Sequence, residues 1–298
     1  MNALERGFLL LTCHLGNPDR KPLTSAQLRT LSERMHGMEV PAENRELLPS
    51  DLVTLGYSHT MAAHICTLLE EEALLEHYLR RAEQQGCVPL TRLSSAYPRL
   101  LRHRLGGEAT GCLWCKGDIS LLDTPGVALV GSRELENANR EFAEEVGRQA
   151  ARQGLVLISG NARGADQAAQ NACLRSGGQV ISVVADCLAD HNLRNNVLYV
   201  SEEAFDAEFS AQRAHSRNRV IHALGRVVFV AQSGLEIGGT WKGTTTNLKH
   251  GWSNVGVFRD GSPASLELEQ RGAWLLEKED LQDLRSLAEA EPNLFTRQ

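Results

Sequence analysis

The stretch "LVLISGNARGADQAAQNACLRSGGQVISVVA", residues 155–185, contains the pattern that decides the fold. It begins and ends with a short, almost wholly apolar run, and the segment from Asp166 to Gly177 between them has the composition of a helix. Two short apolar runs joined through a helical segment predict a βαβ unit, because parallel strands need a crossover connection. Strands without a polar side also indicate that helices cover both faces of the sheet.

The same alternation continues on both sides of this stretch. Short apolar runs recur at "GVALV" (126–130), "NVLYV" (196–200), "RVVFV" (226–230) and "NVGVF" (254–258). Helical patterns occur at "NREFAEEVGRQAARQG" (139–154), "HSRNRVIHALG" (215–225) and "TTTNLKHG" (244–251). We therefore predict an α/β fold with a mostly parallel sheet and helices on both faces.

The chain changes character near residue 120. Before that point, helical patterns dominate; one of them starts at Thr24 with Gln27 three residues later, which is a capping box. We predict a helical N-terminal domain over residues 1–88, a connecting extension over 89–120, the sheet-bearing domain over 121–282 and a C-terminal tail over 283–298.

Composition limits the classes of function. The formal net charge of −6 gives no global basic character, although a basic patch can still be local. Seven scattered cysteines fit reduced thiols, and no apolar run approaches the length of a membrane span, so we expect a cytoplasmic protein without a signal peptide. Cys112 and Cys115 form the only CxxC; without a second ligand pair we expect no metal, and we predict two half-buried cysteines on a strand, with a redox pair as the alternative.

Glycines, hydroxyl groups and arginines follow several of the predicted strands. Because ligands of open parallel sheets bind beyond the carboxyl ends of the strands, these residues predict one anion-binding site. The candidate phosphate-binding residues are Gly131, Ser132, Arg133, Ser159, Gly160, Arg163, Gly164, Asp166, Arg217, Asn218, Arg219, Thr240, Lys242 and Thr244. Asp166 serves equally well as the cap of the helix that follows it.

Two common nucleotide sites are missing from the sequence. "VGSREL" lacks the G-x-G-x-x-G of a dinucleotide site, and Lys242 precedes Gly243-Thr244, the reverse of the order in a P-loop. We therefore expect no NAD-dependent chemistry, no NTP hydrolysis and no cofactor.

The segments "VALVGSR", "LVLISGNARGADQAA", "HSRNRVIHALGRVVFVAQSG" and "GTTTNL" resemble, in order and spacing, the DNA-processing protein A (DprA, or Smf) family. The resemblance implies a Rossmann-like domain over 121–282, preceded by a sterile-alpha-motif or helix-hairpin-helix-like domain. It further implies a homodimer that binds single-stranded DNA without catalysis and loads a RecA-type recombinase in natural transformation. It assigns phosphate contacts to Arg133, Ser159, Gly160, Arg163, Gly164, Arg217 and Arg219. We expect Arg133→Ala or Arg217→Ala to weaken binding and leave the fold intact.

The sequence departs from the family at several places, among them Ser58 in place of the second glycine of the N-terminal hairpin, and one departure bears on base stacking. Ala214 and His215 stand where the family carries an aromatic residue and a proline ahead of "RNR". The surface on which a base would stack is therefore missing from this position, and Trp241 is the candidate replacement.

Two other functions stay open. The pocket could sense a small nucleotide signal, for instance in a defence system, which the lost aromatic residue favours. "IGGTWKGTTTN" also resembles a stretched PGGxGTxxE motif of nucleotide N-glycosidases, but Asn247 stands in the place of the catalytic glutamate. Because an amide cannot act as a carboxylate does in glycosidic cleavage, we expect no catalytic residue.

Overall fold

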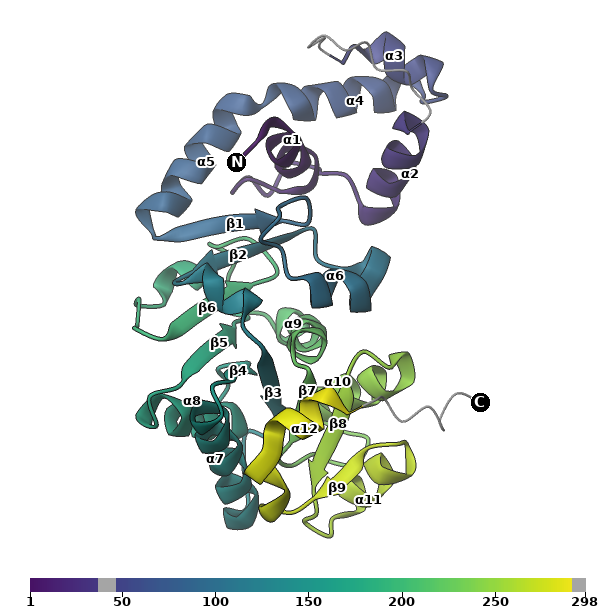
Figure 1. The fold of residues 1–298 in the computed structure, drawn as a ribbon. Coiled ribbons are helices and arrows are strands. Elements are labelled where there is room, and N and C mark those ends of the chain that lie inside the picture. The colour runs from purple at the N-terminus through teal and green to yellow at the C-terminus, as the bar shows by residue number, and fades with distance from the viewer. Residues whose placement is uncertain (37–46, 291–298) are drawn as a thin grey trace.

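The computed structural model describes residues 1–36 and 47–290 (Figure 1). Its centre is a nine-stranded sheet in the order β1-β2-β6-β5-β4-β3-β7-β8-β9. The strands are β1 (Cys87–Thr91), β2 (Cys112–Lys116), β3 (Gly126–Val130), β4 (Val156–Ser159), β5 (Gln179–Val183), β6 (Val197–Ser201), β7 (Val227–Val230), β8 (Asn254–Phe258) and β9 (Trp274–Leu276). From β6 to β9 all neighbouring strands are parallel, whereas β1 and β2 extend one edge in antiparallel pairing.

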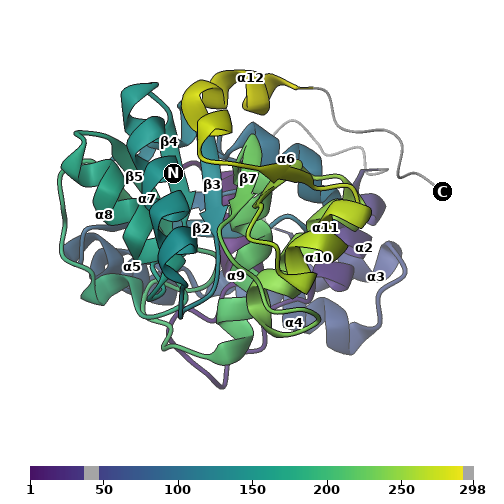
Figure 2. The ribbon, with the colours of Figure 1, turned by 90° about the horizontal axis from the view of Figure 1, so that it is seen from below.

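Helices cover both faces of this sheet, as predicted. The helices of the sheet-bearing half are α7 (Asn137–Arg152), α8 (Ala165–Arg175), α9 (Ala211–Leu224), α10 (Gly238–His250), α11 (Pro263–Gln270) and α12 (Leu284–Glu289). Figure 2 shows α7 and α8 on one side of the strands and α9 to α11 on the other. Phe142 and Val146 belong to the core on the α7 side, and Val220 and Trp241 to the core on the α9 side. The predicted α/β fold is thereby confirmed.

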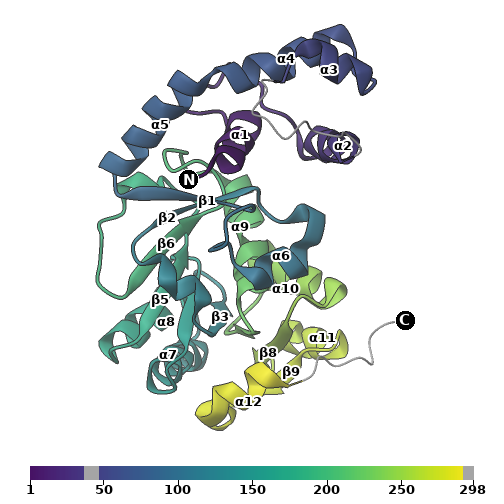
Figure 3. The ribbon, with the colours of Figure 1, turned by 45° about the horizontal axis from the view of Figure 1, so that its top comes forward.

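The N-terminal part is helical. It consists of α1 (Ala3–Thr12), α2 (Ser25–Met35), α3 (Pro49–Thr54), α4 (His59–Glu70) and α5 (Glu72–Gln84). The predicted capping box starts α2, because the Thr24 side chain accepts from the Gln27 amide and the Gln27 side chain accepts from the Thr24 amide. Figure 3 shows α5 leading from α4 to β1. Within the described part of the chain, no helix is both long and apolar enough to cross a membrane.

Helix α5 also contacts the segment that follows β6. The hydroxyl of Tyr78 donates to Asp206 Oδ1 at 2.7 Å, and Arg81 forms an ion pair with the same carboxylate. The ring of Tyr78 packs with Trp114 of β2 and with Phe205, at centroid distances of 5.6 and 4.9 Å. The N-terminal helices and the segment around Asp206 therefore share one cluster of aromatic rings.

Residues 89–120, the predicted connection, add strands to the sheet: Leu90 of β1 faces Leu113 of β2, and β2 pairs in turn with β6. Helix α6 (Arg99–Leu105) lies between the two strands in the chain and packs on α9. Within the predicted tail 283–298, Leu284 is buried and begins α12, while residues 291–298 lie outside the described residues.

Cys112 and Cys115 are more buried than predicted, with exposures of 7% and 0%. They lie three positions apart on β2, so their side chains leave opposite faces of the sheet. Cys112 packs in the core on the α7 side and Cys115 in the core on the α9 side. Because the sheet separates the two thiols, the CxxC spacing makes neither a redox pair nor half of a zinc site.

The strand order places a switch in winding direction next to β3. From β3 the chain proceeds through β4, β5 and β6 in one direction, then returns through α9 to β7 on the other side. The carboxyl ends of the strands near such a switch are where open α/β sheets bind ligands.

Candidate functional site

A cavity of about 270 Å³ lies beyond the carboxyl ends of β3, β4 and β5. Its lining residues are Arg133, Gly160, Asn161, Ala162, Arg163, Ala185, Asp186, Phe209, Ala214 and Arg217. A larger cleft of about 1450 Å³ lies by the N-terminal helices; leucine is the most frequent residue in its lining, which carries both signs of charge. The smaller cavity is the candidate site because three predicted phosphate-binding arginines meet there.

Arg133 and Arg163 supply the free positive charge of the cavity. Arg133 follows β3, Arg163 follows β4, and both side chains are exposed. Within residues 1–36 and 47–290, neither guanidinium group forms a hydrogen bond or an ion pair. Each therefore keeps its full set of donors for a ligand, and a guanidinium fork matches the geometry of a phosphate group.

Arg217 of α9 lies in the same cavity but is buried and already bonded. Its Nη1 donates to the carbonyl oxygens of Gly160 and Val183, which joins the loop after β4 to the end of β5. Its Nη2 lies 3.9 Å from Asp166 Oδ2. Burial lowers the pKa of Arg217, and the Asp166 carboxylate partly opposes this shift. Arg217 thus shapes the cavity as well as lining it.

Asp166 lies in the first turn of α8, behind the cavity lining. It accepts a hydrogen bond from the Ala162 amide at 3.1 Å, so it holds the loop after β4, and Gly164 occupies the cap position instead. Burial raises the pKa of this carboxyl, and the neighbouring Arg217 opposes the rise. Of the two roles weighed for Asp166, that of helix cap is therefore wrong, and the ligand contact stays a prediction.

The glycines of the two loops allow their close approach. Gly164 has a φ of +84°, and a Cβ there would lie 2.3 Å from the carbonyl oxygen of Ser132. A Cβ on Gly131 would lie 2.5 Å from that of Ala165, whose amide donates to the Ser132 carbonyl at 3.1 Å. These residues, predicted as phosphate contacts, serve to bring the β3 and β4 loops together so that Arg133 and Arg163 share one cavity.

Several predicted contacts lie outside the cavity. Arg219 donates to Glu202 Oε2 at 3.0 Å and to the Glu108 carbonyl oxygen at 2.9 Å, which uses its guanidinium group elsewhere. Asn218 donates to the Gly239 carbonyl oxygen at 3.1 Å, and the buried hydroxyl of Ser159 accepts from Gln170 at 3.2 Å.

Helix α10 begins at Gly238, so the glycine-rich segment expected to approach a phosphate is helical. Thr240, Lys242 and Thr244 lie on α10 and do not line the cavity, and Thr244 is fully buried. Asn247 is also buried and exchanges hydrogen bonds of 3.0 Å with Ser253.

The proposed replacement for the missing aromatic residue is wrong. Trp241 is only 6% exposed, and the Arg271 guanidinium lies over its ring at 5.3 Å, so no base can stack on it. Phe209 is instead 57% exposed and lines the cavity beside Ala214, where the family's aromatic residue is missing. The sequence feature that could have predicted an exposed aromatic ring here is the single phenylalanine within the mostly polar stretch "DAEFSAQ" (206–212).

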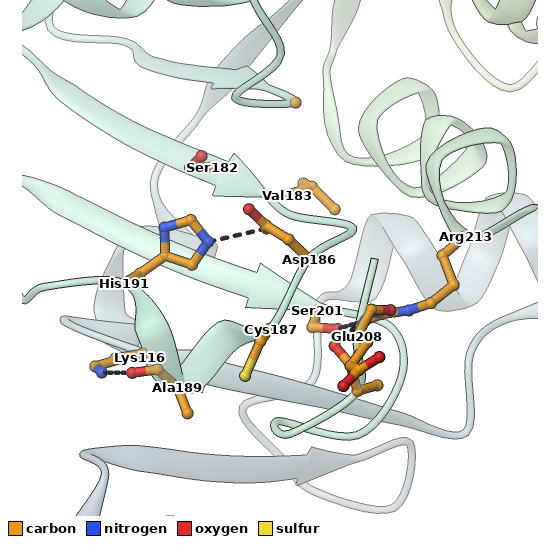
Figure 4. Close-up of polar contacts among 12 residues, drawn as sticks. Lys116, Ser182, Val183, Asp186, Cys187, Ala189, His191, Ser201, Glu208 and Arg213 are labelled. Atoms are coloured by element: carbon orange, nitrogen blue, oxygen red, sulfur yellow. Dashed lines mark hydrogen bonds and ion pairs between the residues drawn. The ribbon is translucent and has the colours of Figure 1, made fainter. Parts of the chain in front are cut away.

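The cavity also contains one carboxylate that the sequence analysis did not single out. Asp186 follows β5, and His191 Nε2 lies 2.9 Å from its Oδ1 (Figure 4). This hydrogen bond is the main cause that lowers the pKa of Asp186. The His191 ring stacks on Tyr199 of β6 at 4.6 Å, which fixes its orientation. With Asp166 set against Arg217, three arginines and two aspartates leave the site a net charge of +1.

Comparison with known proteins identifies the family. The model of the family described as DNA recombination-mediator protein A matches residues 89–280. The DNA processing protein DprA of Streptococcus pneumoniae is 34% identical over 141 residues, which are 44% of this chain and 50% of that protein. DprA of Bacillus subtilis is 28% identical over 170 residues, 53% of this chain and 56% of that protein. The chain therefore spans about half the length of these curated relatives.

Solved structures share the fold. The X-ray structure of S. pneumoniae DprA superimposes with a TM-score of 0.73 and 26% identity, covering 98% of this chain and 99% of that chain. A structure that describes the single-stranded DNA binding mode of Helicobacter pylori DprA gives a TM-score of 0.55 at 24% identity, over 66% and 94% of the chains. With a family match over most of its length and a fold shared across nearly the whole chain, this protein belongs to the DNA recombination-mediator protein A family.

Proposed function

We propose that this protein binds single-stranded DNA by its phosphate backbone at the cavity beyond β3, β4 and β5. The observation that carries the proposal is the pair of exposed guanidinium groups, Arg133 and Arg163, without a partner in the described residues. A relative in the family, from H. pylori, is described as binding single-stranded DNA. Arginine contacts to phosphate position a strand without reading its sequence.

The charge of the site favours a phosphodiester over a small polyphosphate. A net charge of +1 matches the single negative charge of one backbone phosphate, whereas a nucleoside triphosphate would leave several charges uncompensated. The described residues also include no group of three or more histidine, cysteine or acidic side chains that could hold a metal ion. The charge of the site therefore supports a phosphodiester as ligand over a nucleoside triphosphate.

We further propose that the protein acts as a homodimer in the cytoplasm, without catalysis, and delivers the bound strand to a RecA-type recombinase. The description of the family as mediating DNA recombination supports the recombinase partner, and the position of the Asn247 amide outside the cavity supports binding without catalysis. Light scattering would measure the oligomeric state, and co-purification with a RecA-type recombinase on a DNA strand would test the partner.

Fluorescence anisotropy with an oligo-dT strand tests the binding proposal. We expect Arg133→Ala and Arg163→Ala each to weaken binding about tenfold, because each removes a charge-assisted contact to phosphate. Arg175→Ala is the matched control, since this exposed arginine lies at the opposite end of α8 from the cavity. Absence of binding by the wild-type protein at low salt, or equal loss in the control, would contradict the proposal. A rise in the melting temperature on addition of mono- or cyclic nucleotides would then point to a nucleotide sensor.

A further inference from the structure

We propose that the same cavity reads one base of the bound strand, which stacks on Phe209 and donates hydrogen bonds to the carboxylate of Asp186, so that guanine is preferred. This inference rests on the proposed function, because it concerns a strand whose phosphates contact Arg133 and Arg163. It adds base selectivity to a site whose arginine contacts would be indifferent to sequence.

Phe209 is placed as a stacking surface. Every other tryptophan, tyrosine and phenylalanine in the described part of the chain is buried or half-buried, while the Phe209 ring is exposed. It lines the cavity together with Arg133 and Arg163. An exposed aromatic ring next to phosphate-binding cations is the arrangement by which proteins bind unpaired bases.

The backbone on both sides of Phe209 is fixed by one residue, Arg213 of α9. Its buried guanidinium donates from Nη1 to the carbonyl oxygens of Ala207 and Glu208, and from Nη2 to the Ser201 hydroxyl at 3.0 Å (Figure 4). The Arg213 amide donates to the Ser210 side chain at 3.1 Å. Because the residues before and after Phe209 are held, the ring is presented without a large loss of entropy on binding.

The charge of Asp186 repels a phosphate group, but its carboxylate can accept hydrogen bonds from the edge of a base. A carboxylate repels phosphate, so its presence in an anion-binding cavity calls for a different ligand group. Its side chain is 53% exposed, and the hydrogen bond from His191 to Oδ1 orients it and keeps it ionised, as the lowered pKa of Asp186 indicates. An ionised carboxylate only accepts hydrogen bonds. It therefore selects a base that presents donors.

Guanine fits this requirement best among the four bases. Its Watson–Crick edge carries adjacent N1–H and N2–H₂ donors that can meet the two oxygens of a carboxylate. Thymine offers a single N3–H between two carbonyl oxygens, and adenine and cytosine place a ring acceptor beside their one amino group. Reading of an unpaired base at this edge is the usual means of sequence recognition in single strands.

The test measures the anisotropy of oligo-dT strands that carry one dG, dI, dA or dC. Hypoxanthine in dI lacks only the N2 amino group, so we expect dG to bind about tenfold more tightly than dI, the effect of one hydrogen bond to a charged group. In Asp186→Asn, the affinities for the dG and dI strands should become equal. Asp190→Asn removes the same charge from an exposed position on the same loop outside the cavity, and should keep the ratio.

Phe209 is tested in parallel. We expect Phe209→Ala to weaken all strands about tenfold and Phe209→Leu to recover little of it, because stacking needs an aromatic face. Circular dichroism of each variant verifies the fold. Binding with equal affinity for dG and dI, or a dG preference that persists in Asp186→Asn, overturns base reading and leaves backbone binding intact. If no strand binds at low salt, the proposed function itself fails and base reading falls with it.

Discussion

Arg133, Arg217 and Arg219 come from similar short motifs but end in three different environments. Arg133 is exposed and free, Arg217 is buried against two carbonyl groups and Asp166, and Arg219 is paired with Glu202. A motif predicts that an arginine lies near a strand end, but its neighbours in space decide which way the guanidinium points. The sequence could therefore predict which arginines lie near the strand ends. It could not predict which of them is free for a ligand and which is bonded within the protein.

The structure changes the expectation for Arg217→Ala. Removing this side chain leaves the Gly160 and Val183 carbonyl groups without their donor and Asp166 buried without its cation. We expect a loss of about 3–5 kcal/mol in the free energy of unfolding, measured by urea denaturation at neutral pH. Arg133→Ala, which breaks no described contact, should change it by less than about 0.5 kcal/mol. Equal stabilities of the two variants would show that Arg217 is no part of the structural core.

The elements were largely predictable, and their exceptions have identifiable causes. The runs "GVALV", "NVLYV", "RVVFV" and "NVGVF" all form strands, because a continuous apolar run is stable only between two helical layers. Helix α10 begins earlier than predicted because Gly238 and Gly239 suggested a loop, while packing on α9 stabilises the helix. Strand β9 and helix α11 were not predicted, because β9 is short and "PASLELEQ" has a weak apolar face.

The packing of α9 on α10 buries a histidine with a consequence for pH. His222 is fully buried, and neither ring nitrogen has a partner in the described residues. Burial lowers the pKa of His222 from 6.5 to about 3. A group whose pKa is lower in the folded state takes up its proton on unfolding, so the folded protein loses stability as pH falls below 6.5.

We therefore expect His222 to cost about 2 kcal/mol in the free energy of unfolding between pH 7 and pH 5. His222→Leu, which keeps an apolar side chain in the same place, should lose correspondingly less over this range. Urea denaturation of both proteins at the two pH values measures the difference. The same pH dependence in wild type and variant would mean that other groups cause the acid sensitivity.

The molecule as a whole is acidic, while its proposed binding site is locally basic. The formal net charge of −6 gives little attraction for DNA away from the cavity. Binding should thus depend on the few free cations of the site. With Arg133 and Arg163 as the two free phosphate contacts, the logarithm of the association constant should fall with the logarithm of salt concentration with a slope of about −1.4.

Replacing Arg133 by alanine should reduce the magnitude of that slope by about 0.7, and Arg175→Ala should leave it unchanged. Anisotropy titrations at four or more salt concentrations measure both slopes. A slope several times steeper in the wild-type protein would contradict a two-arginine site and indicate a longer cationic track.

The cluster of aromatic rings between α5 and the segment after β6 couples the N-terminal helices to the sheet-bearing domain, so the two cannot be separated without a loss of contacts. The Tyr78 hydroxyl donates a hydrogen bond to Asp206. Phe205, four residues before Phe209, packs against the rings of both Tyr78 and Trp114. Deleting or exchanging the N-terminal helices would remove the Tyr78 hydrogen bond to Asp206 and the Tyr78 contact with Phe205, and would leave Phe205 packed on Trp114 alone among these rings. The helical domain therefore cannot be exchanged freely for a foreign one. A chimaera must retain the contacts of Tyr78 with Phe205 and Asp206 if its ligand site is to keep its shape.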